Sequence, residues 1–201
     1  MSTFRKAKAT PHHTKSTEVK HYRVNEIFHS LQGEGFYTGT PAVFLRFSGC
    51  NRNCDFCDTS HHDHTLMTAS EIAEAVSRFP SRHLVVTGGE PALQLDSDLL
   101  RAIKAHRFYV QIETNGSLPV PVEVDWVTCS PKEAPWEVDR IDELKVVYQG
   151  QDVEEIASLL PATHHFLQPV SGTNIAETVD YCLKHPRWRL SLQTHKLIDI
   201  Q

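Results

Sequence analysis

Short β-rich runs alternate with amphipathic segments from about residue 22 onward, and this alternation constrains the fold more than any other feature of the chain. Strand-like runs separated by helical patterns predict parallel strands that are joined by crossover connections. Seven apolar runs are expected to be strands, at residues 42–47, 84–87, 109–112, 126–128, 144–148, 166–170 and 190–192. The sequence therefore predicts an α/β fold.

Four helices are expected between these strands, and each begins at a polar residue that can cap free backbone amides. Thr68 is followed three residues later by Glu71, which is the pattern of a capping box. Asn174 and Glu177 have the same spacing, and the helix that follows them is expected to bury Leu183. The expected capping residues are Thr68, Asp96, Asp152 and Asn174.

The segment from residue 116 to residue 143 carries no helical pattern, because four prolines interrupt it. A complete eight-stranded α/β barrel typically needs about 250 residues, whereas the chain has 201. We therefore expect an open, partial (β/α) barrel of about six or seven mainly parallel strands. Residues 22–201 are expected to form a single domain, and residues 1–21 a flexible basic tail.

The composition argues against several classes of protein. The formal net charge of −5 disfavours a nucleic-acid-binding protein, which usually presents a basic face. No apolar run reaches the roughly 20 residues that span a bilayer, and the N-terminus has no apolar signal-peptide core. The chain has five cysteines, three of them clustered, which fits a reducing compartment better than a disulfide framework. We expect a cytoplasmic protein that binds neither nucleic acid nor membrane.

Cys50, Cys54 and Cys57 form a CxxxCxxC motif directly after the first apolar run. Three thiolates can hold three corners of a four-iron cluster and leave the fourth iron open to another ligand. A zinc-binding module is the alternative, because one of the histidines between residues 61 and 64 would complete four ligands. The spacing resembles that of the radical S-adenosylmethionine (SAM) superfamily, in which the open iron chelates SAM. This resemblance implies a [4Fe-4S] cluster, SAM and a partial barrel of the radical SAM type.

Three polar turns follow successive expected strands. Residues 88–91 read GGEP, residues 113–116 read ETNG, and residues 130–132 read SPK. Because sites in parallel sheets form at the carboxyl ends of the strands, these turns are expected to line one cavity. Glycines let the backbone approach a ligand closely, and the GGEP turn resembles the superfamily segment that receives the amino group of SAM.

Residues 28–35, which read FHSLQGEG, carry a more specific resemblance. Together with Arg46, Thr59, the GGEP turn and a chain end shortly after residues 193–195, they resemble the 7-carboxy-7-deazaguanine synthase family. The resemblance implies a radical SAM lyase of queuosine and deazapurine biosynthesis. Its reaction converts 6-carboxy-5,6,7,8-tetrahydropterin to 7-carboxy-7-deazaguanine with ring contraction and loss of ammonia. No catalytic residue is implied beyond the cofactor-derived radical.

The same resemblance implies a set of ligand-binding residues. Cys50, Cys54 and Cys57 hold the cluster, and Thr59 binds Mg²⁺, for which a hydroxyl oxygen is a suitable ligand. The implied SAM-binding residues are Phe56, Cys57, Asp58, Gly89, Glu90, Glu113, Asn115, Ser130, Pro131, Lys132, Gln168, Pro169, Val170 and Ser171. The implied substrate-binding residues are Leu31, Gln32, Gly33, Glu34, Arg46, Thr87, His195 and Gln201.

Arg46 also stands out on physical grounds, because it interrupts an apolar strand four residues before Cys50. Burial of an uncompensated charge there would be costly, and a guanidinium can bind the substrate carboxylate through two charge-assisted hydrogen bonds. The resemblance further implies a homodimer and an electron donor of the flavodoxin or ferredoxin type. The alternative enzyme is a glycyl-radical activase, which shares the cysteine spacing and lacks the LQGEG segment.

Overall fold

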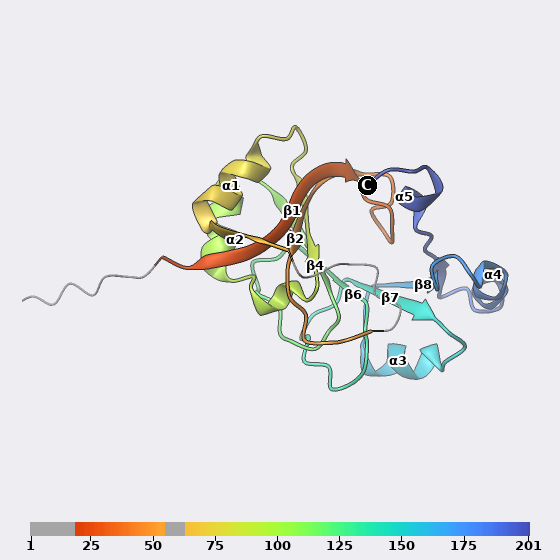
Figure 1. The fold of residues 1–201 in the computed structure, drawn as a ribbon. Helices are drawn as coiled ribbons and strands as arrows, with labels where there is room; N and C mark the ends of the chain where they lie inside the picture. Colours follow the sequence, from red (N-terminus) through yellow and green to blue (C-terminus); the bar gives the residue numbers. More distant parts are fainter. Residues whose placement is uncertain (1–18, 55–62) are drawn as a thin grey trace, which may run out of the picture.

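The structure is a computed structural model that describes residues 19–54 and 63–201. These residues form a nine-stranded sheet in the order β3-β1-β2-β4-β5-β6-β7-β8-β9 (Figure 1). The strands are β1 (His21–Leu31), β2 (Pro41–Phe47), β3 (Thr65–Thr68), β4 (His83–Gly88), β5 (Tyr109–Thr114), β6 (Trp126–Cys129), β7 (Glu143–Tyr148), β8 (His164–Pro169) and β9 (Arg189–Leu190). The helices are α1 (Ala69–Ser77), η1 (Pro91–Leu93), α2 (Ser97–Lys104), α3 (Val153–Leu159), α4 (Ile175–Lys184) and α5 (Thr194–Leu197).

Seven strands, β2 and β4 to β9, run parallel to one another, and they correspond to the seven apolar runs. The sheet has two free ends, at β3 and β9, so the predicted open α/β fold is confirmed. Strands β1 and β3 were not predicted, and they add an antiparallel edge to β2. Their residues are mostly half-buried or exposed, so they lack the continuous apolar run of a parallel strand.

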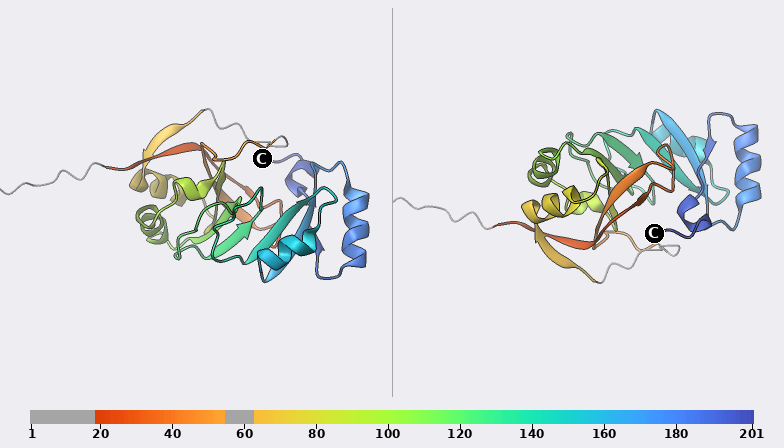
Figure 2. Two further views of the ribbon diagram at one scale, coloured as in Figure 1. Left: turned by 90° about the horizontal axis from the view of Figure 1, so that it is seen from below. Right: turned by 90° about the horizontal axis from the view of Figure 1, so that it is seen from above.

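The expected helix starts are confirmed at α1, α2, α3 and α4, but the capping box expected at α4 is wrong. Thr68 and Glu71 exchange the two hydrogen bonds of a capping box at α1. At α4, Asn174 makes no side-chain cap; its Oδ1 accepts from the Val170 amide instead. Leu183 was expected to be buried and is 78% exposed. Leu183 is exposed because α4 lies at the end of the sheet remote from α1 and α2 and is covered on one side only (Figure 2).

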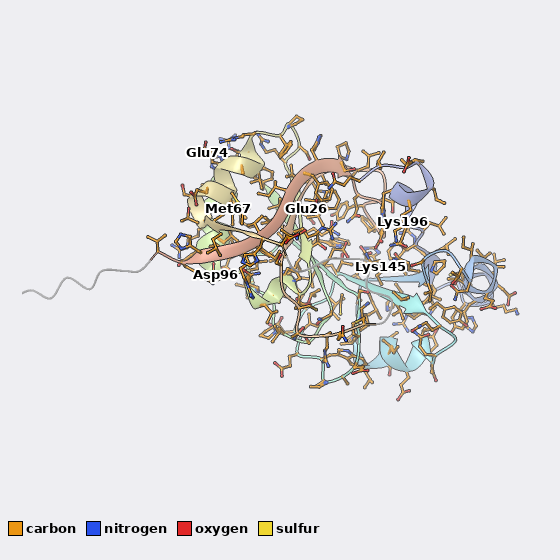
Figure 3. All side chains as sticks on the ribbon, in the orientation of Figure 1. Glu26, Met67, Glu74, Asp96, Lys145 and Lys196 are labelled. Atoms are coloured by element: carbon orange, nitrogen blue, oxygen red, sulfur yellow. The ribbon has the colours of Figure 1, made fainter. Side chains whose placement is uncertain are left out.

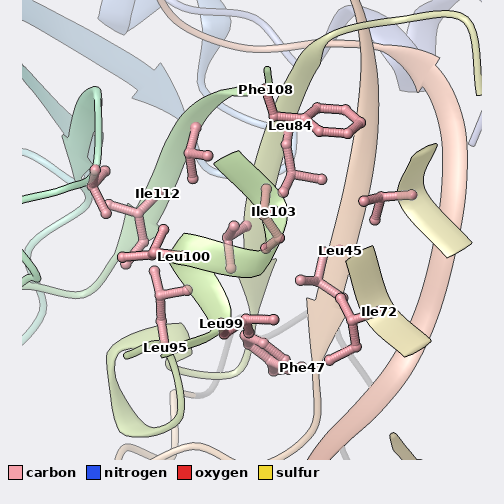
Figure 4. Close-up of a cluster of buried hydrophobic side chains, with 14 of the residues drawn as sticks. Leu45, Phe47, Ile72, Leu84, Leu95, Leu99, Leu100, Ile103, Phe108 and Ile112 are labelled. Atoms are coloured by element: carbon pink, nitrogen blue, oxygen red, sulfur yellow. The ribbon is translucent and has the colours of Figure 1, made fainter. Parts of the chain in front are cut away.

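The parallel strands place alternate residues on two faces, and the two faces differ in chemistry. Apolar side chains of β2, β4 and β5 pack beneath α1 and α2 in one large cluster (Figure 4). A second cluster joins β7 and β8 to α3. The opposite face carries polar side chains at the same strands, and these line a cavity; they include Arg46, Thr87, Glu113, Lys145 and Gln168.

Two further features frame the cavity. Residues 116–142 contain β6 and no helix, as the prolines predicted, so the β5–β6 and β6–β7 crossovers are loops. The C-terminal segment returns to the end of β1, where the Ser30 hydroxyl donates to the Gln201 main-chain oxygen (Figure 1). Among the described residues, none of the helices is long and apolar enough to cross a membrane.

Candidate active site

A cavity of about 600 Å³ lies at the carboxyl ends of the parallel strands. This volume falls within the range of about 300–1,000 Å³ typical of small-molecule sites. Most of the predicted ligand-binding residues line it, in agreement with the rule that sites in parallel sheets form at the carboxyl ends of the strands. They are Leu31, Gln32, Gly33, Glu34, Arg46, Cys50, Cys54, Thr87, Gly89, Glu113, Asn115, Ser130, Lys132, Gln168, Pro169, Val170, Ser171, His195 and Gln201.

Other predicted residues lie elsewhere. Phe56, Cys57, Asp58 and Thr59 fall outside the described residues, and the side chains of Glu90 and Pro131 do not line the cavity. Glu90 is fully buried. Its carboxylate accepts from the Ala92 amide, the Thr114 hydroxyl and the Asn115 amide, at 2.7–2.9 Å. Glu90 therefore ties the end of β4 to the end of β5 through these hydrogen bonds.

The GGEP turn is packed against the start of the cysteine loop. The Gly89 amide donates to the Phe47 carbonyl, and the Glu90 amide donates to the Gly49 carbonyl at 3.0 Å. A Cβ atom on Gly89 would lie 2.1 Å from the Gly49 carbonyl oxygen, so glycine is required there for close backbone approach. The turn and the cysteine loop therefore form one framework.

Asn115 extends this framework from the next strand. Its Nδ2 donates to Asn51 Oδ1 at 3.0 Å, and Asn51 in turn donates to the Ser117 hydroxyl at 2.8 Å. Asn51 lies within the cysteine motif, between Cys50 and Cys54. The amide of Asn115 thus braces the loop that carries the thiols, while the residue also lines the cavity.

The LQGEG segment is held against the C-terminal helix. The Thr194 amide and hydroxyl both donate to the Gly33 carbonyl at 2.9 Å. A Cβ atom on Gly33 would lie 2.1 Å from His195 Nδ1, so the His195 ring occupies the space that a side chain would need. This contact brings two distant predicted substrate residues together on one wall of the cavity.

Arg46 already has a carboxylate partner on the neighbouring strand. Arg46 and Glu26 are paired in the β1–β2 register, and the Arg46 Nε donates to Glu26 Oε1 at 2.7 Å. Gln201 Nε2 donates to the other Glu26 oxygen at 2.7 Å. Glu26 compensates the arginine charge and orients its guanidinium, and the C-terminal residue completes this corner of the cavity (Figure 3 labels Glu26).

A buried ion cluster also lines the cavity. Lys145 Nζ lies 2.6 Å from Glu34 Oε2 and 2.7 Å from Glu113 Oε2 (Figure 3 labels Lys145). Glu34 Oε1 accepts from Gln193 Nε2 at 2.9 Å, and Glu113 Oε1 accepts from Gln32 Nε2 at 3.1 Å. The side chain of Lys145 is only 4% exposed. The lysine therefore links the LQGEG segment to the end of β5.

The cluster holds its members in different charge states. Burial opposes the charge of Glu34, but Lys145 outweighs it and lowers the pKa of Glu34 to about 2. Burial raises the pKa of Glu113 to about 7, opposed by Lys145 and assisted by the charges of Glu34 and Glu143. Burial also raises the pKa of Glu143, whose Oε1 has no hydrogen-bond partner among the described residues. Lys145 thus favours the ionised form of Glu34, whereas burial favours the protonated form of Glu113.

Sequence reasoning missed several lining residues, of which Glu26, Lys145 and Gln193 make the contacts described above. Lys145 carried a usable signal, because it interrupts the apolar run of β7 just as Arg46 interrupts that of β2. An alternation of period two within an otherwise apolar strand marks the inward face. Glu26 and Gln193 carried no such signal.

The described cysteines fit an iron–sulfur site. Cys50 and Cys54 form no disulfide bond with a described residue, and both line the cavity. Lys132 and Arg52 line the same cavity. Cysteine binds iron through its sulfur atom, and both cysteines therefore supply suitable ligand atoms. In the described part of the chain, no three histidine, cysteine or acidic residues are grouped to hold a metal ion. His64, one of the candidate zinc ligands, is exposed.

Comparison with known proteins decides among the alternatives. The family model described as the radical SAM superfamily matches residues 45–158. The 7-carboxy-7-deazaguanine synthase of Bacteroides thetaiotaomicron is 58% identical over 180 residues, which cover 89% of this chain and 98% of that protein. The chain belongs to the 7-carboxy-7-deazaguanine synthase family.

Further members of the synthase family agree. The 7-carboxy-7-deazaguanine synthase of Bordetella pertussis is 44% identical, over 89% of this chain and 99% of that protein. The crystal structure of QueE from Escherichia coli matches with a TM-score of 0.76 and 31% identity, over 87% of this chain and 95% of that chain. The synthase family is a radical SAM family, so the cofactors are a [4Fe-4S] cluster and SAM, and the zinc-module and activase alternatives are excluded.

Proposed function

We propose that the protein converts 6-carboxy-5,6,7,8-tetrahydropterin to 7-carboxy-7-deazaguanine, with contraction of the pyrazine ring and loss of ammonia. The observation that carries this proposal is a single cavity lined by both predicted groups of residues. One group follows the cysteine motif and the strand ends, and the other comes from LQGEG, Arg46 and the C-terminal helix. Relatives named 7-carboxy-7-deazaguanine synthase support the same product.

The substrate end of the cavity provides complementary polar groups. Glu34 and the amide of Gln32 can accept from and donate to the adjacent N–H and carbonyl groups of a pterin edge. At the opposite corner, the Arg46 guanidinium provides donors for the substrate carboxylate, with Glu26 holding its Nε. Thr87 pairs with Arg46 in the β2–β4 register and lies on the same face of the sheet. These groups fix the orientation of the ring in the cavity.

The cofactor end is assembled from the framework of turns. Cys50, Cys54 and Cys57 would hold the cluster, and Gly89, Ser130 and Lys132 would lie beside SAM. When bound, the cluster and SAM supply the 5′-deoxyadenosyl radical that removes a hydrogen atom from C6 of the substrate. The contribution of the protein is to orient the two molecules and to exclude water and competing hydrogen donors. Thr59 would ligate Mg²⁺ together with substrate oxygens and water.

The test is anaerobic turnover with reconstituted protein, SAM, Mg²⁺, a reductant and 6-carboxytetrahydropterin, followed by mass spectrometry. We expect a 7-carboxy-7-deazaguanine product that disappears without SAM. Formation of 5′-deoxyadenosine without that product would leave the radical chemistry in place and refute the substrate. Omission of Mg²⁺ tests the proposed metal requirement separately.

The proposal includes a cytoplasmic homodimer and an electron donor of the flavodoxin or ferredoxin type. The exposed apolar residues on α4 and α5, which are Ile175, Leu183, Leu197 and Ile198, support a protein interface at that end. Light scattering of the purified protein tests the dimer, and a monomer mass at micromolar concentration would reject it. Replacement of the chemical reductant by reduced flavodoxin or ferredoxin in the turnover assay tests the donor.

A further inference from the structure

Lys145 is the most buried cation among the residues that line the cavity, and the proposed reaction assigns it no role. It projects from the centre of β7 into the cavity, while its neighbours Leu144 and Val146 face the apolar cluster beneath α3. Two carboxylates, Glu34 and Glu113, lie within 2.7 Å of its ammonium group. Burial removes the hydration of a cation, and ion pairs offset this cost only when their geometry is very good. A lysine that is kept in this position therefore suggests a function.

Glu34 is the partner whose position depends most on Lys145. It lies in the LQGEG segment, which has no regular secondary structure between Leu31 and Pro41. Its two oxygens have different partners: Oε2 accepts from Lys145 Nζ at 2.6 Å, and Oε1 accepts from Gln193 Nε2 at 2.9 Å. An ionised carboxylate offers about four acceptor positions, so the two that remain are available for a ligand in the cavity. Of the two side chains that hold the Glu34 carboxylate, Lys145 and Gln193, only the lysine carries a charge.

We propose that Lys145 is a positioning residue for substrate recognition, which orients the Glu34 carboxylate toward the N–H edge of the pterin and is itself anchored by Glu113. This inference rests on the proposed function, because it concerns the same substrate. Lys145 acts through Glu34 and makes no contact with the reacting atoms. Glu113 lies at the end of β5, so the lysine couples recognition of the ring to the strand end that faces SAM.

The charges around Lys145 explain why a lysine is needed. Glu34, Glu113 and Glu143 approach it from the LQGEG segment, β5 and β7, and each acts on its charge. Without Lys145, burial would favour the protonated form of Glu34. A protonated carboxyl group is a poorer acceptor for an N–H edge, and its orientation would be set by Gln193 alone.

The experiment measures binding of 6-carboxypterin, an air-stable aromatic form of the substrate ring, to cluster-loaded protein with SAM by anaerobic calorimetry. Lys145→Met is expected to weaken binding by about tenfold to hundredfold, the range for a charge-assisted hydrogen bond. Lys145→Arg keeps the charge and is expected to lose less. Lys104→Met is the matched control, because Lys104 makes a 2.7 Å pair with Asp125 away from the cavity.

A double-mutant cycle separates positioning from a general structural effect. If Lys145 acts through Glu34, Lys145→Met should change the dissociation constant by less than about twofold in a Glu34→Gln background. An equal loss in both backgrounds, or a Lys145→Met constant within twofold of the wild type, would overturn the inference. A smaller loss for Met than for Arg would also overturn it.

Folding and the proposed function are controlled in the same series. If Lys145→Met shows no cooperative thermal transition, Lys145→Gln replaces it, because it keeps a hydrogen-bond donor without the charge. If wild-type protein binds neither 6-carboxypterin nor 7-carboxy-7-deazaguanine, the proposed function fails and the inference fails with it. If wild-type protein binds and turns over normally while the lysine variants do the same, only the inference fails.

Discussion

Replacement of Glu90 by glutamine distinguishes a structural brace from a SAM ligand. The Glu90 carboxylate accepts three hydrogen bonds, with the Ala92 amide and the Thr114 hydroxyl on Oε1 and the Asn115 amide on Oε2. Glutamine keeps one oxygen and replaces the other by an NH₂ group. In either orientation, at least one buried backbone N–H then faces another donor and loses its acceptor.

The size of the effect follows from these contacts. A buried donor without a partner costs about 1–3 kcal/mol, so Glu90→Gln should lower the free energy of unfolding by about 2 kcal/mol. For a chain of 201 residues, about 2–4 °C per kcal/mol converts this into a fall in Tm of about 4–8 °C. Glu90→Ala should cost more, because it removes both acceptor oxygens, and with them all three hydrogen bonds, and leaves a cavity.

The assay is thermal unfolding by circular dichroism, with SAM affinity measured on cluster-loaded protein at low temperature. Glu137→Gln is the control, because it makes the same chemical change at an exposed position of the β6–β7 connection. The brace predicts a lower Tm and a SAM dissociation constant within about tenfold of the wild type. An unchanged Tm together with a large loss of SAM affinity would refute the reasoning and make Glu90 a ligand.

Three further predictions follow from the same geometry. Arg46→Ala should raise the KM for the pterin by about tenfold to hundredfold, which corresponds to the free energy of one charge-assisted hydrogen bond. The iron content of the protein should be unchanged. Loss of iron would make Arg46 a structural residue. Thr68→Ala removes the capping box of α1 and should lower the free energy of unfolding by about 1 kcal/mol. The turnover of this variant at 25 °C should equal that of the wild type. The pKa of Glu113 is about 7 in the folded protein, against 4.5 ordinarily. The folded state therefore binds the proton more tightly than the unfolded state does. The free energy of unfolding should fall by about 3 kcal/mol as the pH rises from 4.5 to 7. Glu113→Gln should remove this slope in urea titrations at several pH values, and an identical slope in both proteins would contradict the assignment.

The strands and the position of the site were predictable because both depend on local patterns. The seven parallel strands are short apolar runs, since both of their faces are covered. The cysteine motif and the polar turns follow strand ends, and parallel strands bring their carboxyl ends to one edge. The edge strands β1 and β3 were missed, since their half-exposed residues form no apolar run.

Side-chain roles were less predictable, as Glu90 and Asn174 show. Their sequence patterns indicated SAM binding for Glu90 and a helix cap for Asn174, and neither pattern indicates the long-range hydrogen bonds that the two side chains make. In the structure, Glu90 accepts from Asn115, which is 25 residues away, and Asn174 donates to the Tyr148 carbonyl, 26 residues away. A polar side chain satisfies whichever donors and acceptors the fold brings to it, and local sequence does not contain that information.

The sequence by itself determined the family of fold, the cluster-binding motif and the turns that surround the cavity, because spacing along the chain sets strand faces and strand ends. Only the tertiary structure decided which charges meet. Lys145 and Glu34 are 111 residues apart, and Gln201 and Glu26 are 175 residues apart. Their contacts depend on strand register and on the return of the C-terminal segment, which are set by packing of the whole sheet.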